Sequence, residues 1–248
     1  MRVGAARAVA LLSVGLLVAG CTAITGGKAQ PASRLTTLTG PAIRRALVGD
    51  RTLSRILQQP FMIDDRRPPR YGGPETLQDF ESPAPVGCLG VAEMLHHSVY
   101  LPGKVNDVAV ETWRHAATPT KVTSVKEGVV SLPSEADAYA LFSRFAQQWQ
   151  RCDGQSVVLP DRVLRLKAKI ANIQVAPAVL AGNVWIGFDA PGDTTSIPAG
   201  RALGVRGNCL VEVEVDFFNA SNRSMQGSGI INATAVDIAR AMMDKVSP

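Results

Sequence analysis

The sequence has 248 residues, a hydrophobic content of 46% and a formal net charge of +5. This length suits one domain with a substantial core, and the mild positive charge gives no indication of a nucleic-acid partner. Without residues 1–20, which carry Arg2 and Arg7 and no acid, the formal charge falls to +3.

The first twenty residues predict export. Arg2 and Arg7 precede an apolar run, 8–19, that has the length of a secretory signal core and is too short to span a bilayer as a helix. The following letters, VAGC, resemble the bacterial lipobox, which implies cleavage before Cys21 and lipid attachment to its thiol. The alternative is an ordinary cleaved signal that happens to contain a cysteine. We expect a chain anchored by lipid to the cell membrane on its extracytoplasmic side.

Residues 21–46 predict a flexible tether that begins with the lipidated cysteine, because Thr, Ser, Gly, Ala and Pro dominate there without an apolar period. The folded domain is expected over 47–248. It begins with a short helix over 47–57 and a charged, proline-rich loop over 60–74.

Helices and strands alternate along the rest of the chain. Helical spacing of apolar residues predicts helices over 85–98, with Cys88 turned inward, from the capping residue Ser134 to about Arg151, and from Thr234 onward. Strands are expected over 105–117, 121–132, 156–159, 163–175, 183–189 and 201–218. This order favours an α+β fold, a single domain in which helices flank a mostly antiparallel sheet.

Two of these strands have charged faces of opposite sign. The basic face carries Arg162, Arg165, Lys167 and Lys169. The acidic face, on the last strand, carries Glu212, Glu214 and Asp216. The basic face is a candidate for contact with phospholipid headgroups or acidic glycans. The explanation that we favour places the two faces on neighbouring strands, where opposite charges stabilise the sheet.

Three cysteines remain once Cys21 is lipidated, and export permits them to form disulfides. Cys88 and Cys152 each lie on the buried side of a predicted helix or at its end, and two helices on one face of a sheet can bring them within bridging distance. Cys209 is in phase with the apolar residues of the last strand, which is typical of a small buried side chain.

The cysteine-bearing helices also carry a family pattern. The lipobox, the Thr/Ser/Pro-rich segment, the letters GCLG around Cys88, and FAQQWQRCDG, which contains Trp149, Cys152 and Gly154, resemble the PknH-like extracellular sensor domain. That domain is found on actinobacterial Ser/Thr kinases and on stand-alone lipoproteins. The resemblance covers about residues 45–247 and implies an α+β domain with a cleft for an unidentified ligand.

The resemblance also implies two disulfides. Cys88 and Cys152 match the first. Cys209 matches one half of the second, but the partner would stand near Val163, where this sequence has no cysteine. The resemblance therefore implies that Cys209 is a free, buried thiol, and that the cleft lacks one bridge of the family.

No pattern predicts a metal or a cofactor. The histidines are His96, His97 and His115, and the two adjacent ones point in different directions on a helix. The sequence contains neither HExxH nor CxxC. We expect no metal and no cofactor.

No pattern predicts catalysis either. Ser228 in QGSGI lacks the flanking residues of a nucleophile elbow. Asp189 and Asp193 can be imagined as a carboxylate pair, but a Pro-Gly turn with solvated acids explains them equally well. We expect no catalytic residue.

The leading hypothesis is a non-catalytic, lipid-anchored envelope protein that binds a small-molecule, lipid or glycan ligand, or an envelope protein partner, in a cleft. The sequence does not identify the ligand-binding residues. The alternatives are a carrier of lipid or glycolipid and an envelope hydrolase whose catalytic residues are scattered along the chain.

Overall fold

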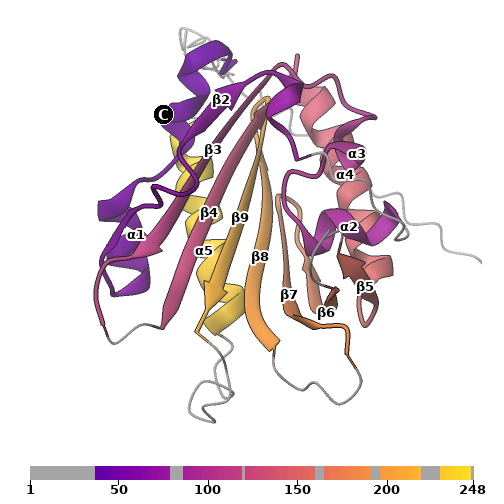
Figure 1. The fold of residues 1–248 in the computed structure, drawn as a ribbon. Coiled ribbons are helices and arrows are strands. Elements are labelled where there is room, and N and C mark those ends of the chain that lie inside the picture. Colours follow the sequence, from indigo (N-terminus) through magenta and orange to yellow (C-terminus); the bar gives the residue numbers. More distant parts are fainter. Residues whose placement is uncertain are drawn as a thin grey trace, which may run out of the picture. The chain divides into compact units, whose positions relative to one another are not determined.

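The computed structural model describes residues 37–78, 86–118, 121–159, 165–190, 196–218 and 230–246. Within them, nine strands form one sheet in the order β1-β3-β4-β9-β8-β7-β6-β5, and β2 pairs with β3 (Figure 1). Every pairing in the sheet is antiparallel. The α+β prediction is confirmed.

The strands are β1 (Phe61–Ile63), β2 (Arg70–Gly72), β3 (Asp107–His115), β4 (Val122–Ser131), β5 (Ser156–Leu159), β6 (Leu166–Val175), β7 (Val179–Phe188), β8 (Ser196–Arg206) and β9 (Cys209–Phe217). The helices are η1 (Gly40–Ala46), α1 (Asp50–Leu57), η2 (Pro74–Thr76), α2 (Val86–Ala92), α3 (His97–Tyr100), α4 (Glu135–Cys152) and α5 (Ile230–Val246). None of the described helices is long and apolar enough to cross a membrane.

Each face of the sheet has its own core. On one face, which we call the front, apolar side chains of α2, α3 and α4 pack against alternate residues of β3 to β9. On the other face, the back, side chains of η1, α1 and α5 pack against the intervening residues. Strand residues alternate between the two faces, so Leu210 lies in the front core and Val211 in the back core.

Helix α4 follows from its sequence as predicted. The Ser134 side chain accepts a hydrogen bond from the backbone N–H of Asp137 at 3.1 Å, which caps the first turn. The apolar stripe of the helix, which includes Phe145 and Trp149, is buried and ends at Cys152. The stripe therefore directs this cysteine into the front core.

The sequence predicts a single strand over 201–218. This prediction is wrong, because a hairpin divides the segment into β8 and β9. Gly207 and Asn208 form the turn, and Gly207 has a φ of +52°, a conformation that favours glycine. The Gly-Asn pair between two apolar runs is a known hairpin signal. The alternation of the last strand is confirmed, but it belongs to β9 alone.

The predicted tether is too long at its C-terminal end. Residues 40–46 form η1, in which Ile43 and Ala46 are fully buried in the back core. The backbone N–H of Leu38 also donates to Asn208 at 2.9 Å. The folded domain thus begins near residue 38. The buried side chains of Leu38, Ile43 and Ala46 anchor this segment, although its apolar residues do not follow a helical or strand period.

Two further elements differ from prediction. The segment over 60–74, expected as a loop, contributes β1 and β2, which pair along β3. The helix expected over 85–98 ends at Ala92, and α3 follows after Leu95, whose φ is +58°. Leu95 stays buried, as its helical spacing suggests, but a turn rather than a helix carries it into the core.

Candidate functional site

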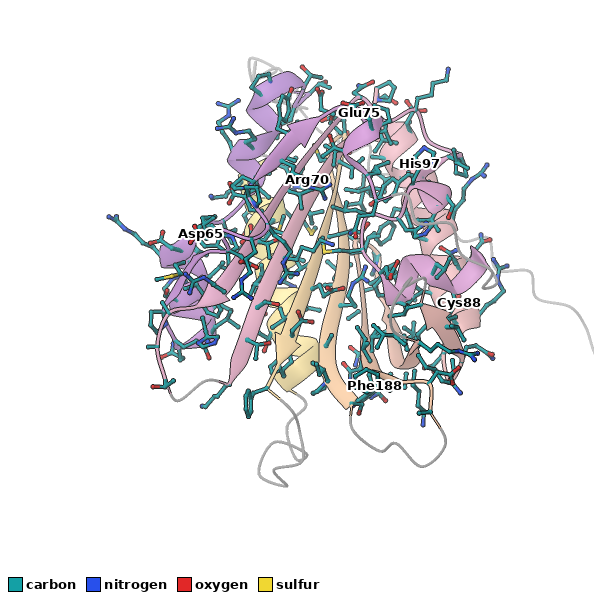
Figure 2. The ribbon with its side chains drawn as sticks, in the orientation of Figure 1. Asp65, Arg70, Glu75, Cys88, His97 and Phe188 are labelled. Carbon is teal, nitrogen blue, oxygen red and sulfur yellow. A yellow bond between two sulfur atoms is a disulfide. The ribbon has the colours of Figure 1, made fainter. Side chains whose placement is uncertain are left out.

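A hollow of about 520 Å³ lies beside the ends of β3 and β4, where the segment joining β1 and β2 passes over them. It is lined by Asp64, Asp65, Arg66, Arg67, Arg114, His115, Thr123 and Ser124. Figure 2 shows Asp65, from the β1–β2 segment, at the left of the molecule, well apart from Cys88 and Phe188. The hollow therefore belongs to the part of the sheet that lies away from the disulfide.

A tight turn positions the first wall of the hollow. The Asp64 carboxylate accepts hydrogen bonds from the backbone N–H of Arg66 at 3.1 Å and from Nε of Arg67 at 3.0 Å. The backbone N–H of Asp64 donates to the Thr112 carbonyl on β3 at 2.9 Å, which ties the turn to the sheet. Burial acts to raise the pKa of Asp64, but these hydrogen bonds and the charges of both arginines outweigh it and lower the pKa.

The opposite wall is built by the register of three strands. Arg114, Ser124 and Asp216 are direct neighbours across β3, β4 and β9 and share the front face. The Ser124 hydroxyl donates to the Asp216 carboxylate. Burial, and next the nearby charge of Glu214, raise the pKa of Asp216 to about 6, against the opposing effects of Ser124 and the nearby cations.

More charge lies next to this wall along the front face. Lys126 on β4 is paired with Glu214 on β9 in the register, and Glu93 follows α2. Burial lowers the pKa of Lys126, although Glu214 partly compensates. Burial, together with the charge of Glu214, raises the pKa of Glu93 to about 7. Burial thus raises the pKa of both Glu93 and Asp216, to about 7 and about 6.

A buried ion pair separates this polar region from the front core. Arg201 on β8 is completely buried and lies 2.7 Å from Glu212 on β9. It also donates to the Val91 carbonyl of α2 at 2.9 Å and lies over the Trp149 ring of α4, 5.9 Å from its centroid. Since its partners come from three elements, Arg201 connects the helices to the sheet.

The lining of the hollow suits an anion. Three guanidinium groups, from Arg66, Arg67 and Arg114, face two carboxylates in the lining, and one of these, Asp64, is engaged by its own turn. The side chain of Asp65 is 86% exposed and lies 3.7 Å from Arg114, so it is a weak competitor for that cation. Arginine forks are the usual donors to phosphate, sulfate and carboxylate groups.

The predicted disulfide is confirmed. Cys88 and Cys152 form a disulfide with their Cα atoms 5.6 Å apart. Cys209 is buried and free, and burial, with a smaller effect of the Asp107 charge, raises the pKa of its thiol to about 12. Cys21, the predicted lipid site, and Val163, where the family would have its fourth cysteine, lie outside the described residues.

Other residues singled out in the sequence do not come together. His115 lies at the hollow, whereas His96 and His97 belong to the start of α3. Asp189 follows β7, which three strands separate from β3, and it lies 3.7 Å from Arg165. Asp193, Ser228 and Arg162 lie outside the described residues. Among the residues that the structure describes, no group of three metal-ligating side chains forms a metal site.

The favoured explanation of the two charged strand faces is wrong. In the sheet, β7 and β8 lie between β6 and β9, so the basic and acidic faces are not neighbours. They also lie on opposite sides. Glu214 faces the front, in register with Lys126 and Arg201, whereas Lys167 and Lys169 alternate with the front-core residues Ala168 and Ile170. The acidic residues are compensated by β4 and β8 instead.

Sequence reasoning missed the arginines of the hollow. Arg66 and Arg67 lie in the DDRR run, within the segment that the sequence predicts as a loop. Arg114 lies on a strand whose apolar alternation is weak. Only the pairing of β1 and β3, which brings positions fifty residues apart into register, puts these residues at one place. The one local sign of this site is the DDRR run itself, in which two acids are followed by two bases and then by prolines.

An α+β sheet with a helical layer on each face and a polar hollow at one side defines the general class of this protein. A family model described as the PknH-like extracellular domain matches residues 38–245, and the chain belongs to that family. Among solved structures, the extracellular domain of PknH from Mycobacterium tuberculosis has the same fold, with a TM-score of 0.65 and 16% sequence identity over 85% of this chain and 98% of that one. No curated protein matches the chain significantly.

Proposed function

We propose that this protein is a lipid-anchored envelope protein whose non-catalytic, sensor-like domain binds an anionic ligand in the hollow between the β1–β2 segment and the β3–β4 strands. The observation that carries the proposal is the set of three arginines that line one hollow against two carboxylates, one of them engaged by its own turn. Membership of a family named for an extracellular domain supports the exported location.

The lining of the hollow suits the binding of a charged ligand, because arginines are donors to anionic groups, whereas the Thr123 and Ser124 hydroxyl groups already donate to Asp216. The charged lining also suits a polar ligand better than the acyl chain that a lipid carrier holds.

Thermal unfolding with inorganic phosphate as the probe tests the anion site. At equal ionic strength set by sodium chloride, 50 mM phosphate should raise the unfolding temperature by about 3 °C, as expected for a dissociation constant of a few millimolar. The variant Arg114→Gln should lose most of this shift. Arg206→Gln, which removes the same charge at an exposed position outside the hollow, is the matched control. Equal shifts in both variants would contradict the proposal.

The anchor is tested separately by the intact mass of the protein extracted from membranes with detergent. We expect a chain that begins at Cys21 and carries the mass of a diacylglyceryl group. A chain cut elsewhere, or one beginning at Cys21 without added mass, would overturn the lipoprotein assignment and leave the anion site untouched. Cys21→Ser should prevent the modification and release the protein from the membrane.

A further inference from the structure

The back of the sheet at β5, β6 and β7 carries cations that have no acidic counterpart on the same strands. Lys167 and Lys169 are exposed, and the side chain of Arg165 is 83% exposed. The sequences of β5, β6 and β7 contain no aspartate or glutamate. Within the described part of the chain, the acid that pairs with these cations is Asp189, 3.7 Å from Arg165, and an ion pair this long and exposed compensates little charge.

The cross-strand neighbours of the two lysines are residue types that are common at membrane interfaces. Lys169 is flanked by Ser156 on β5 and the half-buried Trp185 on β7. Lys167 is flanked by Val158, which is 38% exposed, and by Gly187. Lysine and tryptophan side by side on a flat surface suit the headgroup layer, because the amine reaches phosphate while the indole lies at the boundary with the acyl chains.

The helix on this side leaves the face uncovered. Helix α5 packs on β8, β9 and β7, and Figure 1 shows it crossing behind the middle of the sheet rather than behind β5 and β6. Among the residues that the structure describes, β5, β6 and the part of β7 around Trp185 thus present a basic surface that α5 borders on one side.

We propose that this basic face, defined by Arg165, Lys167, Lys169 and Trp185, docks on anionic phospholipid headgroups of the membrane that holds the anchor. The charge of the face complements such a surface, and each lysine or arginine near it strengthens binding about fivefold. The inference rests on the proposed function, because the strength of the docking depends on the lipid anchor. The chain between Cys21 and the folded domain, which begins near residue 38, can reach at most about 55 to 60 Å. Even weak docking then becomes intramolecular.

Docking on this face leaves the hollow accessible. Arg114 and Ser124 share the front face with the core residues Val110 and Val130, whereas the lysines of β6 point to the back. A domain that lies on the membrane by its basic face would hold the hollow toward the extracytoplasmic space.

Residue-specific labelling of lysines tests the docking. The full lipidated chain is inserted into vesicles of phosphatidylcholine, alone or with 30 mol% phosphatidylglycerol, and is treated briefly with an amine-acetylating reagent. We expect the labelling of Lys167 and Lys169 to fall at least fivefold on the anionic vesicles only. Lys104 and Lys121, which are exposed elsewhere, should label equally on both.

A variant in which the charge of the two lysines is reversed provides a second test. Brominated phosphatidylglycerol should quench the fluorescence of Trp185 in the wild type and not in the variant Lys167→Glu/Lys169→Glu, whereas the variant Lys104→Glu should behave as the wild type. Unchanged labelling of Lys167 and Lys169, or equal protection on neutral vesicles, would overturn the inference. If Cys21 carries no lipid, the same labelling with the chain added to vesicles in solution still reports on the basic face, so the two failures are distinguishable.

Discussion

At the scale of single residues, Arg201 is a completely buried cation that depends on partners from three elements. Glu212 accepts from it at 2.7 Å, and the Tyr100 hydroxyl and the Leu95 backbone N–H also donate to Glu212. An ion pair of this kind contributes little net free energy relative to an apolar pair, but breaking it leaves a charge without compensation in the interior.

Arg201→Met should therefore lower the free energy of unfolding by about 3 to 5 kcal/mol, because Glu212 then lacks its cation. The double variant Arg201→Met/Glu212→Gln should recover part of this loss, since the amide oxygen can still accept from Tyr100 and Leu95. Urea unfolding of the two variants measures both effects. A loss below about 1 kcal/mol in the single variant would show that the pair is not as tightly buried as described.

Glu127 is a second buried ionisable side chain, on the back face. One carboxylate oxygen accepts from the Val48 backbone N–H at 2.8 Å, and the side chain lies directly across from Glu111 in the register. Burial, only partly offset by the Val48 hydrogen bond, raises the pKa of Glu127 to about 8.

This raised pKa predicts a stability that falls as pH rises. Between pH 5 and 7, Glu127 keeps its proton in the folded state and loses it in the unfolded state, so the unfolding free energy should fall by about 1.4 kcal/mol per pH unit. Above the folded pKa the contribution is lost completely. Glu127→Gln should remove this part of the dependence and be more stable than the wild type at pH 7.5. Urea unfolding across this pH range measures it, and equal slopes in both proteins would contradict the assignment.

At the scale of elements, the disulfide joins α2 to α4 over the front core. It closes a loop with a sequence separation of 64 residues. Because a cross-link restricts the unfolded chain, the entropy of this loop corresponds to about 4 kcal/mol.

The double variant Cys88→Ser/Cys152→Ser should unfold with about 4 kcal/mol less free energy than the oxidised wild type, and reduction of the wild type should have the same effect. Cys209→Ala is the control, and it should cost only about 1 kcal/mol for a small cavity. Chemical denaturation with and without reductant measures these differences. A disulfide variant as stable as the Cys209 variant would show that the cross-link is dispensable.

How far the elements could be predicted depended on the length of their periodic pattern. Helix α4 has an apolar stripe over five turns and a capping serine, so its boundaries were correct within about one residue. Strand β9 alternates over its whole length, but nothing in that alternation shows where β8 ends, and the Gly207-Asn208 turn decides it. Short elements such as β1 and η1 exist only because long-range partners hold them, so local pattern could not reveal them.

The candidate site was less predictable than the fold for the same reason. The disulfide could be anticipated because each cysteine lies on the apolar stripe of its own helix and the family pattern names the pair. The hollow depends on the register of β1, β3 and β4, which no short stretch of sequence encodes. The error in the charged strand faces also came from strand order, since β7 and β8 separate strands that were assumed to be neighbours.

At the scale of the whole molecule, the sheet separates two functions that we assign to its two faces. The hollow, with its arginines, lies beside the front face at the β1–β3 edge of the sheet. The basic side chains lie on the back face, near the other edge, which β5 and β6 form. Asp216, whose pKa burial raises to about 6, accepts a hydrogen bond from Ser124 at the hollow and lies near the charge of Arg67.

Anion binding in the hollow should therefore strengthen in mild acid. As Asp216 gains a proton between pH 7.5 and 5.5, negative charge beside Arg67 is lost, and the dissociation constant for sulfate should fall by about threefold. Sulfate is the suitable probe because its own charge does not change in this range. Isothermal titration at both pH values measures the effect, and an affinity that is constant or falls on acidification would contradict it.

Amide NMR of the isotope-labelled chain, titrated with sulfate against a chloride reference, reports directly on anion binding in the hollow. We expect saturable shifts confined to the lining, that is Asp64 to Arg67, Arg114, His115, Thr123 and Ser124, and their loss in Arg114→Gln. Shifts that do not saturate, or that gather elsewhere on the domain, would contradict it.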